Sequence, residues 1–327
     1  MEEVVDKVKE LTEKLDKGVE EILTSDRFKA YLKQMSKFHK YSFRNTLLIL
    51  MQNENATFVA GYNAWKTQFN RQVNRGEQGI YILAPCPYKV KKEIEFTNEK
   101  GEKEKKTEEV LIPKFRTVSV FDVSQTSGEP LKQLAEELQG EYKDYKKLFE
   151  AIKQCSDYEV TFKAGMESKG SCFIKSKKIF INEGMSEVQT IKTLIHEVAH
   201  EKLHADVSDD VSKNQKEVEA ESVAFVVSNY FGIDTSSYSF DYISSWQKKE
   251  KADVKHSLAT IQETSNMLIE KIKNNMCSEK EVSIYDKIKE AKEKASNQEV
   301  TKKQAKTKNK NIGFEEEEKW VLKIKLY

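Results

Sequence analysis

The sequence lacks the paired cysteines that mark disulfide frameworks and cysteine-bound zinc sites. Its four cysteines are widely separated and form no CxxC pair: Cys86, Cys155, Cys172 and Cys277. Disulfide-rich secreted domains and cysteine-type zinc modules both need closely spaced cysteines, so the sequence argues against both classes. Few, scattered cysteines suit a reducing cytosol.

Long apolar runs are also missing. No uninterrupted apolar run exceeds the five residues of Leu47–Met51, whereas a membrane-spanning helix needs about 20 residues. The first residues of the chain, Met1 to Lys14, lack the apolar stretch of a signal peptide. We therefore expect a cytoplasmic protein with no membrane partner.

A charge imbalance is the third missing feature. The 327 residues include 33% charged residues, yet the formal net charge is only +1, so whole-chain charge points to no class of partner. With 38% apolar residues the chain is globular but polar. Its length suits two domains with modest cores, long exposed helices and some disordered sequence.

The pattern of apolar residues predicts an α+β protein. Apolar residues recur at helical spacing up to about residue 55, and short β-prone runs punctuated by glycine follow between residues 58 and 125. Within that part, Glu93 to Glu109 is dense in Lys and Glu and predicts a long, solvated hairpin tip. The first domain is therefore expected to combine helices with an antiparallel sheet.

The second half begins after a polar linker at Gln125 to Pro130, which we take as a domain boundary. A strand pair is expected in this half at 160–162 and 178–181, and Gly232 occupies the position of a helix C-cap glycine. The expected helices span about 131–155, 186–204, 215–231 and 244–273, and residues 301–311 form a low-complexity, Lys-rich tail that we expect to be disordered.

One of these helices carries a metal-binding motif. Ser186 and Gln189 form a plausible capping box, and the helix that they open contains His196-Glu197-Val198-Ala199-His200. His196 and His200 lie four residues apart, so both imidazoles project from one side of the helix, as two ligands of a tetrahedral zinc ion must. Glu197 lies beside that position, where it can act as the general base of a hydrolysis.

A catalytic zinc ion needs a third protein ligand and an open position. The next predicted helix offers Glu217, Glu219 and Glu221, of which Glu217 and Glu221 are one turn apart on one face. We assign Glu217 as the ligand and Glu221 as the carboxylate behind it that hydrogen-bonds a ligand histidine. Glu219 points away from that face and is expected to be solvated or in a separate pair.

The alternative is an accidental HExxH pattern on an ordinary surface helix. The capping residues and the acidic second helix both disfavour this alternative. His204, one turn after His200, is interpreted as a surface histidine, with substrate contact as the other possibility. His39 and His256 have no partners nearby in the sequence, and no role is assigned to them.

Residues 155–235 resemble the ImmA/IrrE-type zincin domain. The resemblance rests on the strand Lys178–Asn182, the HEVAH helix and the downstream pattern Glu217-x-x-Ala220-Glu221-x-x-Ala224. It implies a zincin-like metallopeptidase fold in which an edge strand precedes the HExxH helix and the downstream helix supplies the glutamate ligand. The family usually has Asn or Asp at the position of Glu221.

The N-terminal half is locally basic. Between Arg27 and Lys92 there are twelve Lys or Arg residues against two acids, Glu54 and Glu77. Aromatic residues are interleaved with these cations. Cations that follow a phosphate backbone, with aromatic rings on which bases stack, are the ingredients of a single-strand binding groove. Taken alone, the pattern fits equally well a solvated basic face over an aromatic core.

A second resemblance favours the groove. Four spaced motifs occur in the order found in the N-terminal domain of ArdC-like antirestriction proteins, a domain associated with single-stranded DNA. They are Tyr41-Ser42-x-x-Asn45, Gly61-x-x-x-Trp65-Lys66, Val73-x-Arg75-Gly76-Glu77-Gln78-Gly79 and Val120-Phe121-Asp122-Val123. The resemblance extends to LtrC-like proteins of Gram-positive conjugative elements. The charged segment at 91–109 and the C-terminal extension have no counterpart in these families. The residues expected to contact DNA are Tyr41, Arg44, Asn45, Trp65, Lys66, Arg71 and Arg75, with Arg71, Arg75, Lys66 and Arg44 as the favoured phosphate contacts. The alternative for Trp65 and Val73 is a place in the core.

Together these features predict three parts: an ArdC-like DNA-binding domain (1–127), a zincin-like metal domain (128–240) and a helical extension with its tail (241–327). The first functional hypothesis is a mobile-element, antirestriction-like protein that binds single-stranded DNA and carries a zinc-dependent peptidase site. The second is an ImmA-type peptidase that cleaves a repressor or another regulatory protein, with the N-terminal domain for recruitment. The third is a DNA-binding protein whose zinc is purely structural.

Overall fold

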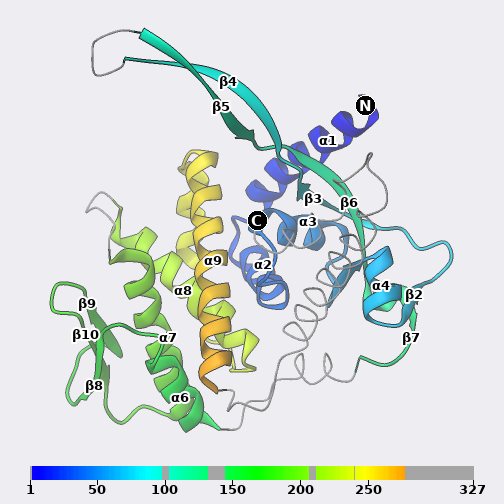
Figure 1. Ribbon diagram of the computed structural model, residues 1–327. Coiled ribbons are helices and arrows are strands. Elements are labelled where there is room, and N and C mark those ends of the chain that lie inside the picture. Colours follow the sequence, from blue (N-terminus) through cyan, green and yellow to red (C-terminus); the bar gives the residue numbers. More distant parts are fainter. Residues whose placement is uncertain (1, 98–102, 132–143, 206–210, 239, 277–327) are drawn as a thin grey trace, which may run out of the picture.

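The computed structural model describes residues 2–97, 103–131, 144–205, 211–238 and 240–276 (Figure 1). It combines helices with small sheets, as the α+β prediction requires. The first half comprises α1 (Glu2–Glu21), α2 (Ser25–Lys37), α3 (Phe43–Gln52), β1 (Val59–Gly61), α4 (Tyr62–Gln68), β2 (Arg71–Val73), β3 (Ile80–Pro85), β4 (Tyr88–Thr97), β5 (Lys103–Ile112), β6 (Phe115–Asp122), the 3₁₀ turn η1 (Val123–Gln125) and β7 (Thr126–Gly128). The second half comprises α6 (Tyr145–Lys153), β8 (Glu159–Lys163), β9 (Gly170–Phe173), β10 (Lys178–Asn182), α7 (Glu187–His204), α8 (Lys213–Tyr230), the 3₁₀ helix η2 (Asp241–Lys248) and α9 (Lys251–Met276).

The N-terminal helices form where the apolar spacing predicts them. The buried residues of α2, Phe28, Tyr31, Leu32 and Met35, recur at three- and four-residue intervals and make one apolar face. Helix α3 begins at the Ser42 cap, whose side chain accepts a hydrogen bond from the backbone N–H at position 45. The helical character predicted up to about residue 55 is thus confirmed, and it is divided among three helices.

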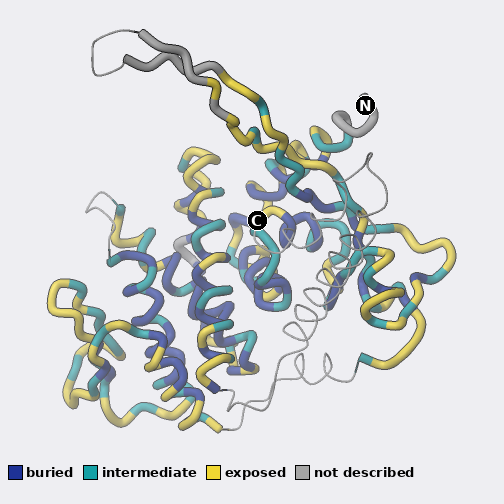
Figure 2. The backbone as a smooth tube through the Cα atoms, viewed as in Figure 1, coloured by how far each residue is buried: buried dark blue, intermediate teal, exposed yellow. Residues whose placement is uncertain are grey.

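The β-rich part is a three-stranded antiparallel sheet in the order β1-β6-β3, with the pair β2-β7 beside it. Helices α1 and α3 pack against the sheet. The β4-β5 hairpin projects away from the body of the protein (Figures 1 and 2). Its ladder continues to the pair Thr97 and Lys103, so most of the segment predicted as a hairpin tip is paired strand. Residues 98–102 lie outside the described part.

The second sheet corrects one expectation. Its order is β8-β10-β9, with β10 parallel to β8 and antiparallel to β9. The predicted strand pair β8-β10 is confirmed, but the resemblance implied an edge strand at Lys178–Asn182, and β10 is the central strand. The edge that faces α7 is β9 instead. Strand β9 was not predicted because it is only four residues long and shows no clear alternation of apolar residues.

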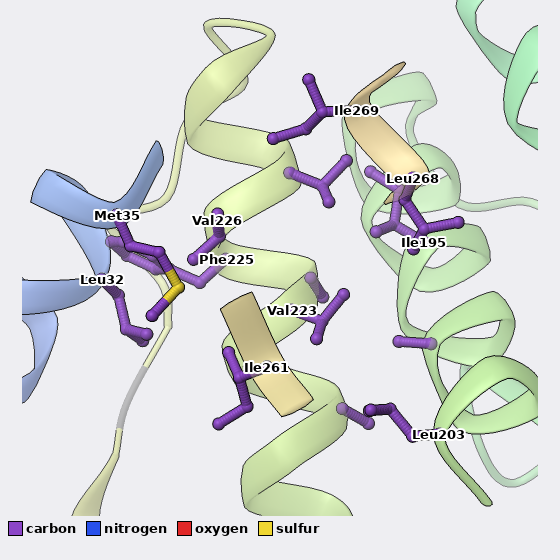
Figure 3. Close-up of a cluster of buried hydrophobic side chains, with 14 of the residues drawn as sticks. Leu32, Met35, Ile195, Leu203, Val223, Phe225, Val226, Ile261, Leu268 and Ile269 are labelled. Carbon is purple, nitrogen blue, oxygen red and sulfur yellow. The ribbon is translucent and has the colours of Figure 1, made fainter. Parts of the chain in front are cut away.

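One apolar core joins the two halves of the chain. Helix α8 packs against α2 on one side and against α7 and α9 on the other (Figure 3). Leu32 and Met35 of α2 belong to the same buried cluster as Phe225 of α8 and Ile195 of α7. The boundary at residue 127 stays a prediction, but the packing of the core crosses it, because α1–α3 bury their apolar faces against the C-terminal helices.

The C-terminal helices end and begin close to their predicted positions. Gly232 follows α8 with a φ of 67°, the left-handed conformation expected of a C-cap glycine. Helix α9 starts at Lys251 rather than near residue 244, because η2 takes up the preceding turns. Buried residues along α9 place it inside the core rather than in a peripheral extension. The predicted tail at 301–311, and residues 132–143 of the predicted 131–155 helix, lie outside the described residues.

None of the helices that the structure describes combines the length and the apolar character needed to cross a membrane.

Candidate metal centre and nucleic-acid surface

Helix α7 holds the two histidines in register. The Ser186 hydroxyl accepts a hydrogen bond of 3.3 Å from the Gln189 backbone N–H, which caps the helix as predicted. The Gln189 side chain reaches forward to Thr193 instead of back to the cap, so only half of the capping box forms. Four residues apart on one face, His196 and His200 bring their Nε2 atoms to 3.0 Å from each other.

Helix α8 brings two carboxylates to these histidines. Oε2 of Glu217 lies 3.5 Å from Nε2 of His196 and 3.5 Å from Nε2 of His200. The ligand atoms of these three residues all lie within 4.8 Å of one another, so they form a candidate divalent-metal site. Oε2 of Glu221 is 3.0 Å from Nδ1 of His196. The N–H direction of that nitrogen is not aligned for a linear hydrogen bond, so the contact is a close ion pair.

The electrostatics of the cluster favour a positive charge at its centre. Burial alone would lower the pKa of His196, but Glu217, Glu221 and the nearby charge of Glu197 outweigh it and raise the pKa to about 10. Hydrogen bonds from His196 and His200 lower the pKa of Glu217 well below its usual range. Carboxylates that hold a proton on an imidazole this strongly also suit a cation held between the imidazole nitrogens. The donor set of two imidazoles and one carboxylate therefore fits a divalent metal.

Glu197 is the buried neighbour of this cluster. Its exposed fraction is 6%, and burial raises the pKa of its carboxyl group. The side chain lies against β9: a Cβ atom added at Gly170 would come within 2.7 Å of Oε1 of Glu197 and 2.6 Å of Cγ2 of Thr193. Glycine at this position lets the edge strand approach α7 closely. The sequence pattern did not single out Gly170, since one glycine in a short strand carries no signal of its own.

A pocket of about 740 Å³ opens over the cluster. It lies between β9 with the residues just before it, helix α7 and helix α8. His196, Glu197, His200, Glu217 and Glu221 all contribute to its lining. The five residues predicted for the metal site are therefore adjacent, and they face a cavity of the size of a ligand or substrate site.

His204 is not the surface histidine that the sequence suggested. It is 4% exposed, and its Nε2 lies 3.1 Å from the backbone oxygen of Lys216. Its Nδ1 is 4.0 Å from Oε2 of Glu219. The other carboxylate oxygen, Oε1, accepts hydrogen bonds from Ser257 and Gln215. Glu219 is thus in a separate, buried polar group, the second of its two predicted environments. This group joins α7, α8 and α9 directly beside the metal ligands, because the His204 ring lies 5.5 Å from the His200 ring, measured between centroids, and lines the same pocket.

Three of the predicted DNA contacts have structural roles instead. Trp65 is fully buried, and its indole N–H donates a 2.9 Å hydrogen bond to the Phe121 carbonyl. Asn45 is buried and bonds both backbone groups of Leu83 at 2.9 Å, which ties α3 to β3. The Arg71 guanidinium donates hydrogen bonds to the Thr126 hydroxyl and to the carbonyls of Thr126, Gly128 and Glu129, and these bonds hold β2 against β7. Neither a base nor a phosphate can reach the two buried side chains, and Arg71 would have to break these bonds first.

The other predicted contacts remain available. Arg44, Lys66 and Arg75 are exposed. Tyr41 is half-buried, its hydroxyl donates to the Val59 carbonyl at 3.1 Å, and burial raises its pKa to about 12. The ring of Tyr81, another stacking candidate, is covered by the Lys7 ammonium at 3.5 Å.

Folding partly neutralises the positive charge of the basic segment from Arg27 to Lys92. Within the described part of the chain, three of its twelve cations form ion pairs with acids from outside the segment. These pairs are Arg27 with Glu21 at 2.9 Å, Lys40 with Glu270 at 3.3 Å and Lys89 with Glu109 at 3.1 Å. The net charge of +10 counted along the sequence therefore overstates the local field, because folding brings distant carboxylates to the same surface.

Comparison with known proteins supports the ArdC-like resemblance. Residues 1–121 match the family described as the N-terminal domain of anti-restriction factor ArdC. An uncharacterized protein of Bacillus anthracis is 26% identical over 308 residues, which is 83% of this chain and 51% of that protein. The chain thus spans about half the length of the curated relative that it matches. The ImmA/IrrE-type resemblance of the second half stays a prediction.

Among solved structures, two crystal structures of the antirestriction protein ArdC from the R388 plasmid are similar. The metal-free structure is 19% identical and has a TM-score of 0.45, with 72% of this chain and 85% of that chain covered. The Mn(II)-bound structure is 17% identical and has the same TM-score, with 73% and 86% covered.

Proposed function

We propose that this chain is a mobile-element, antirestriction-like protein that binds single-stranded DNA and carries a zinc-dependent peptidase site. The match of residues 1–121 to the ArdC N-terminal domain family supports the mobile-element class. The observation that carries the enzymatic part is the convergence of His196, His200 and Glu217 beside a buried Glu197.

Zinc is the metal that this donor set suits best. Two imidazoles and one carboxylate with an open position are typical of catalytic zinc, whereas magnesium and calcium prefer shells of oxygen alone. When bound, zinc polarises the scissile carbonyl and makes the attacking water more acidic. Glu221, 3.0 Å from the far nitrogen of His196, holds that imidazole in place for binding.

We assign proton transfer to Glu197 and substrate binding to strand β9. A carboxylate whose pKa is raised by burial accepts a proton more readily, which suits Glu197 to the role of general base. Strand β9 lines the pocket and is the sheet edge next to α7. An extended peptide can add to this edge through backbone hydrogen bonds, with its scissile bond over the metal. We therefore place the substrate on β9 and not on the Lys178–Asn182 strand, which is central in its sheet and has no free edge.

Metal analysis of full-length protein and of matched variants tests this site. The wild type should hold about one zinc ion per chain, and His196→Ala/His200→Ala should lose it. Glu197→Gln should keep the zinc while cleavage of a denatured test protein such as casein stops. Stoichiometric zinc in the double histidine variant, or undiminished cleavage by Glu197→Gln, would refute the assignment.

The DNA-binding part rests on the resemblance of residues 1–121 and on the exposed cations Arg44, Lys66 and Arg75. Such cations bind phosphates through a term that weakens steeply as salt rises. An anisotropy titration of the full chain against matched single-stranded and duplex oligonucleotides tests it, with single strands expected to bind more tightly. The full chain is needed because α1–α3 share their core with the C-terminal helices. Equal affinity for both forms, or none at low salt, would refute it.

The alternative is an ImmA-type peptidase that cleaves a specific regulatory protein, with the N-terminal part recruiting it. The pocket beside an open strand edge favours a peptide ligand. In the antirestriction reading Glu197→Gln leaves DNA binding intact, and any biological effect that depends on binding survives. In the peptidase reading the same variant abolishes the effect.

A further inference from the structure

A second pocket, of about 430 Å³, lies in the N-terminal half. It is formed by the turn after α2, the face of the β1-β6-β3 sheet, and helix α4. Tyr41 and Gly61, from two motifs that are distant in sequence, both line it. Among the described residues, no residue lines both this pocket and the one over the metal cluster. We call it the aromatic pocket.

Five phenylalanine and tyrosine residues line it: Phe38, Tyr41, Phe58, Tyr62 and Phe69. Phe38 meets Tyr41 edge-on with ring centroids 5.8 Å apart, and Phe58 meets Phe69 in the same way at 5.3 Å. Tyr62 also lines the pocket, and 53% of its surface is exposed. Its ring is therefore accessible to a flat group that enters from solvent.

The polar lining is cationic. The residues around the aromatic pocket include Lys37, Lys40 and Arg116 and no Asp or Glu. Lys40 pairs with Glu270 at 3.3 Å, and Lys37 reaches the Ala56 carbonyl at 3.4 Å. Arg116 is exposed, and its guanidinium makes no hydrogen bond or ion pair within the described part of the chain. An anionic group at the rim of the pocket could thus bind the Arg116 guanidinium without displacing a partner among the described residues.

Neutral polar groups complete the lining. Asn63, Gln68 and Ser119 are exposed at the pocket and offer two amides and a hydroxyl. Amides and hydroxyls donate and accept hydrogen bonds at once, as the edge of a nucleobase requires. Flat apolar walls, polar edges and a cationic rim together match a base with its phosphate better than they match a basic or purely apolar peptide.

We propose that the aromatic pocket takes one unstacked nucleobase of a DNA single strand, with the adjoining phosphate at Arg116. The inference rests on the proposed binding of single-stranded DNA and names the place where a base is held. The volume falls in the range of about 300–1,000 Å³ that is usual for small-ligand sites. A base inside a duplex is stacked and paired and cannot enter without being extruded, so the pocket gives a structural reason for single-strand preference.

The test compares two oligonucleotides of equal length and charge on the full chain, an ordinary single strand and an abasic one with no bases. Tyr62→Ala removes the exposed ring of the pocket. Tyr88→Ala is its matched control, because Tyr88 is 49% exposed and lies on β4, outside the pocket. Thermal unfolding of both variants confirms that each is folded, since Tyr62 also contacts Phe121 at a centroid distance of 6.1 Å.

The wild type should bind the ordinary strand more tightly than the abasic one. Tyr62→Ala should weaken binding of the ordinary strand roughly 10-fold, within the range for loss of one stacked base, and should leave the abasic strand unchanged. Arg116→Gln should weaken both strands, and Tyr88→Ala should weaken neither. Equal wild-type affinity for the two strands, or no difference between the two tyrosine variants, would overturn the nucleobase pocket alone. Binding of neither strand at low salt would overturn the DNA-binding function itself.

Discussion

Two glutamates on α8, Glu217 and Glu219, are chemically identical and two residues apart, yet they should differ completely as metal ligands. Glu217 lies 3.5 Å from the Nε2 atoms of both candidate histidine ligands. Glu219 is 7% exposed and accepts hydrogen bonds from Ser257 at 2.6 Å and Gln215 at 3.0 Å. The change to glutamine at each position removes a charge and keeps the shape, so the pair separates metal binding from packing.

The expected magnitudes follow from these contacts. Glu221→Gln removes a partner of a ligand and should weaken zinc affinity about 10–100-fold, or roughly 1.4–2.7 kcal/mol. Glu217→Gln removes a ligand itself and should exceed that range. Glu219→Gln should leave zinc affinity within about twofold, but it should lower the free energy of unfolding of the metal-free protein by roughly 1–3 kcal/mol, since charged acceptors make the stronger hydrogen bonds.

Competition with a chromophoric zinc chelator measures the affinities of the three variants, and denaturant unfolding of the metal-free proteins measures their stabilities. The reasoning is refuted if Glu219→Gln loses zinc while Glu217→Gln retains it, because the register of α8 would then be wrong by two residues. It is also refuted if Glu221→Gln weakens zinc as much as Glu217→Gln, because the two carboxylates would then share the ligand role.

Three further predictions concern other parts of the molecule. Gly170→Ala should push β9 away from α7 and lower the free energy of unfolding by about 1–3 kcal/mol. It should also reduce any peptidase activity while zinc stays bound. Metal analysis and denaturant unfolding of the same variant test this. Arg75→Gln should weaken single-strand binding to all sequences alike and reduce the dependence of log affinity on log salt concentration by about one unit. Arg71→Gln should chiefly lower the melting temperature, because the Arg71 guanidinium links β2 to β7. Burial lowers the pKa of His39 in the folded protein, so the unfolded chain binds the proton first and the free energy of unfolding should fall as pH drops below about 6.5. His39→Gln should therefore show a smaller fall in melting temperature between pH 7 and 5. The control His256→Gln, at an exposed histidine, should behave like the wild type.

Local patterns in the sequence were enough to predict the helices and the geometry within each of them. The spacing of Phe28, Tyr31 and Leu32 predicted a helix at α2, and the spacing of His196 and His200 predicted that both imidazoles project from one side of α7. These predictions hold because helical periodicity depends only on neighbours within one or two turns. The choice of Glu217 over Glu219 used the same periodicity, and the distances from Glu217 to both histidines agree with it.

Tertiary packing alone decided which polar and aromatic side chains are available to a ligand. The sequence pattern makes Trp65 and Asn45 candidate DNA contacts, but both are buried and hydrogen-bonded to the sheet, Trp65 to Phe121 of β6 and Asn45 to Leu83 of β3. For the same reason, the sequence did not predict that β9 is the sheet edge beside the metal cluster. It also did not predict that one apolar core joins both halves of the chain. A hydrogen bond or a buried contact between segments tens of residues apart leaves no periodic trace in a single sequence. Whether a side chain faces solvent, a ligand or another segment is therefore fixed only when the chain folds.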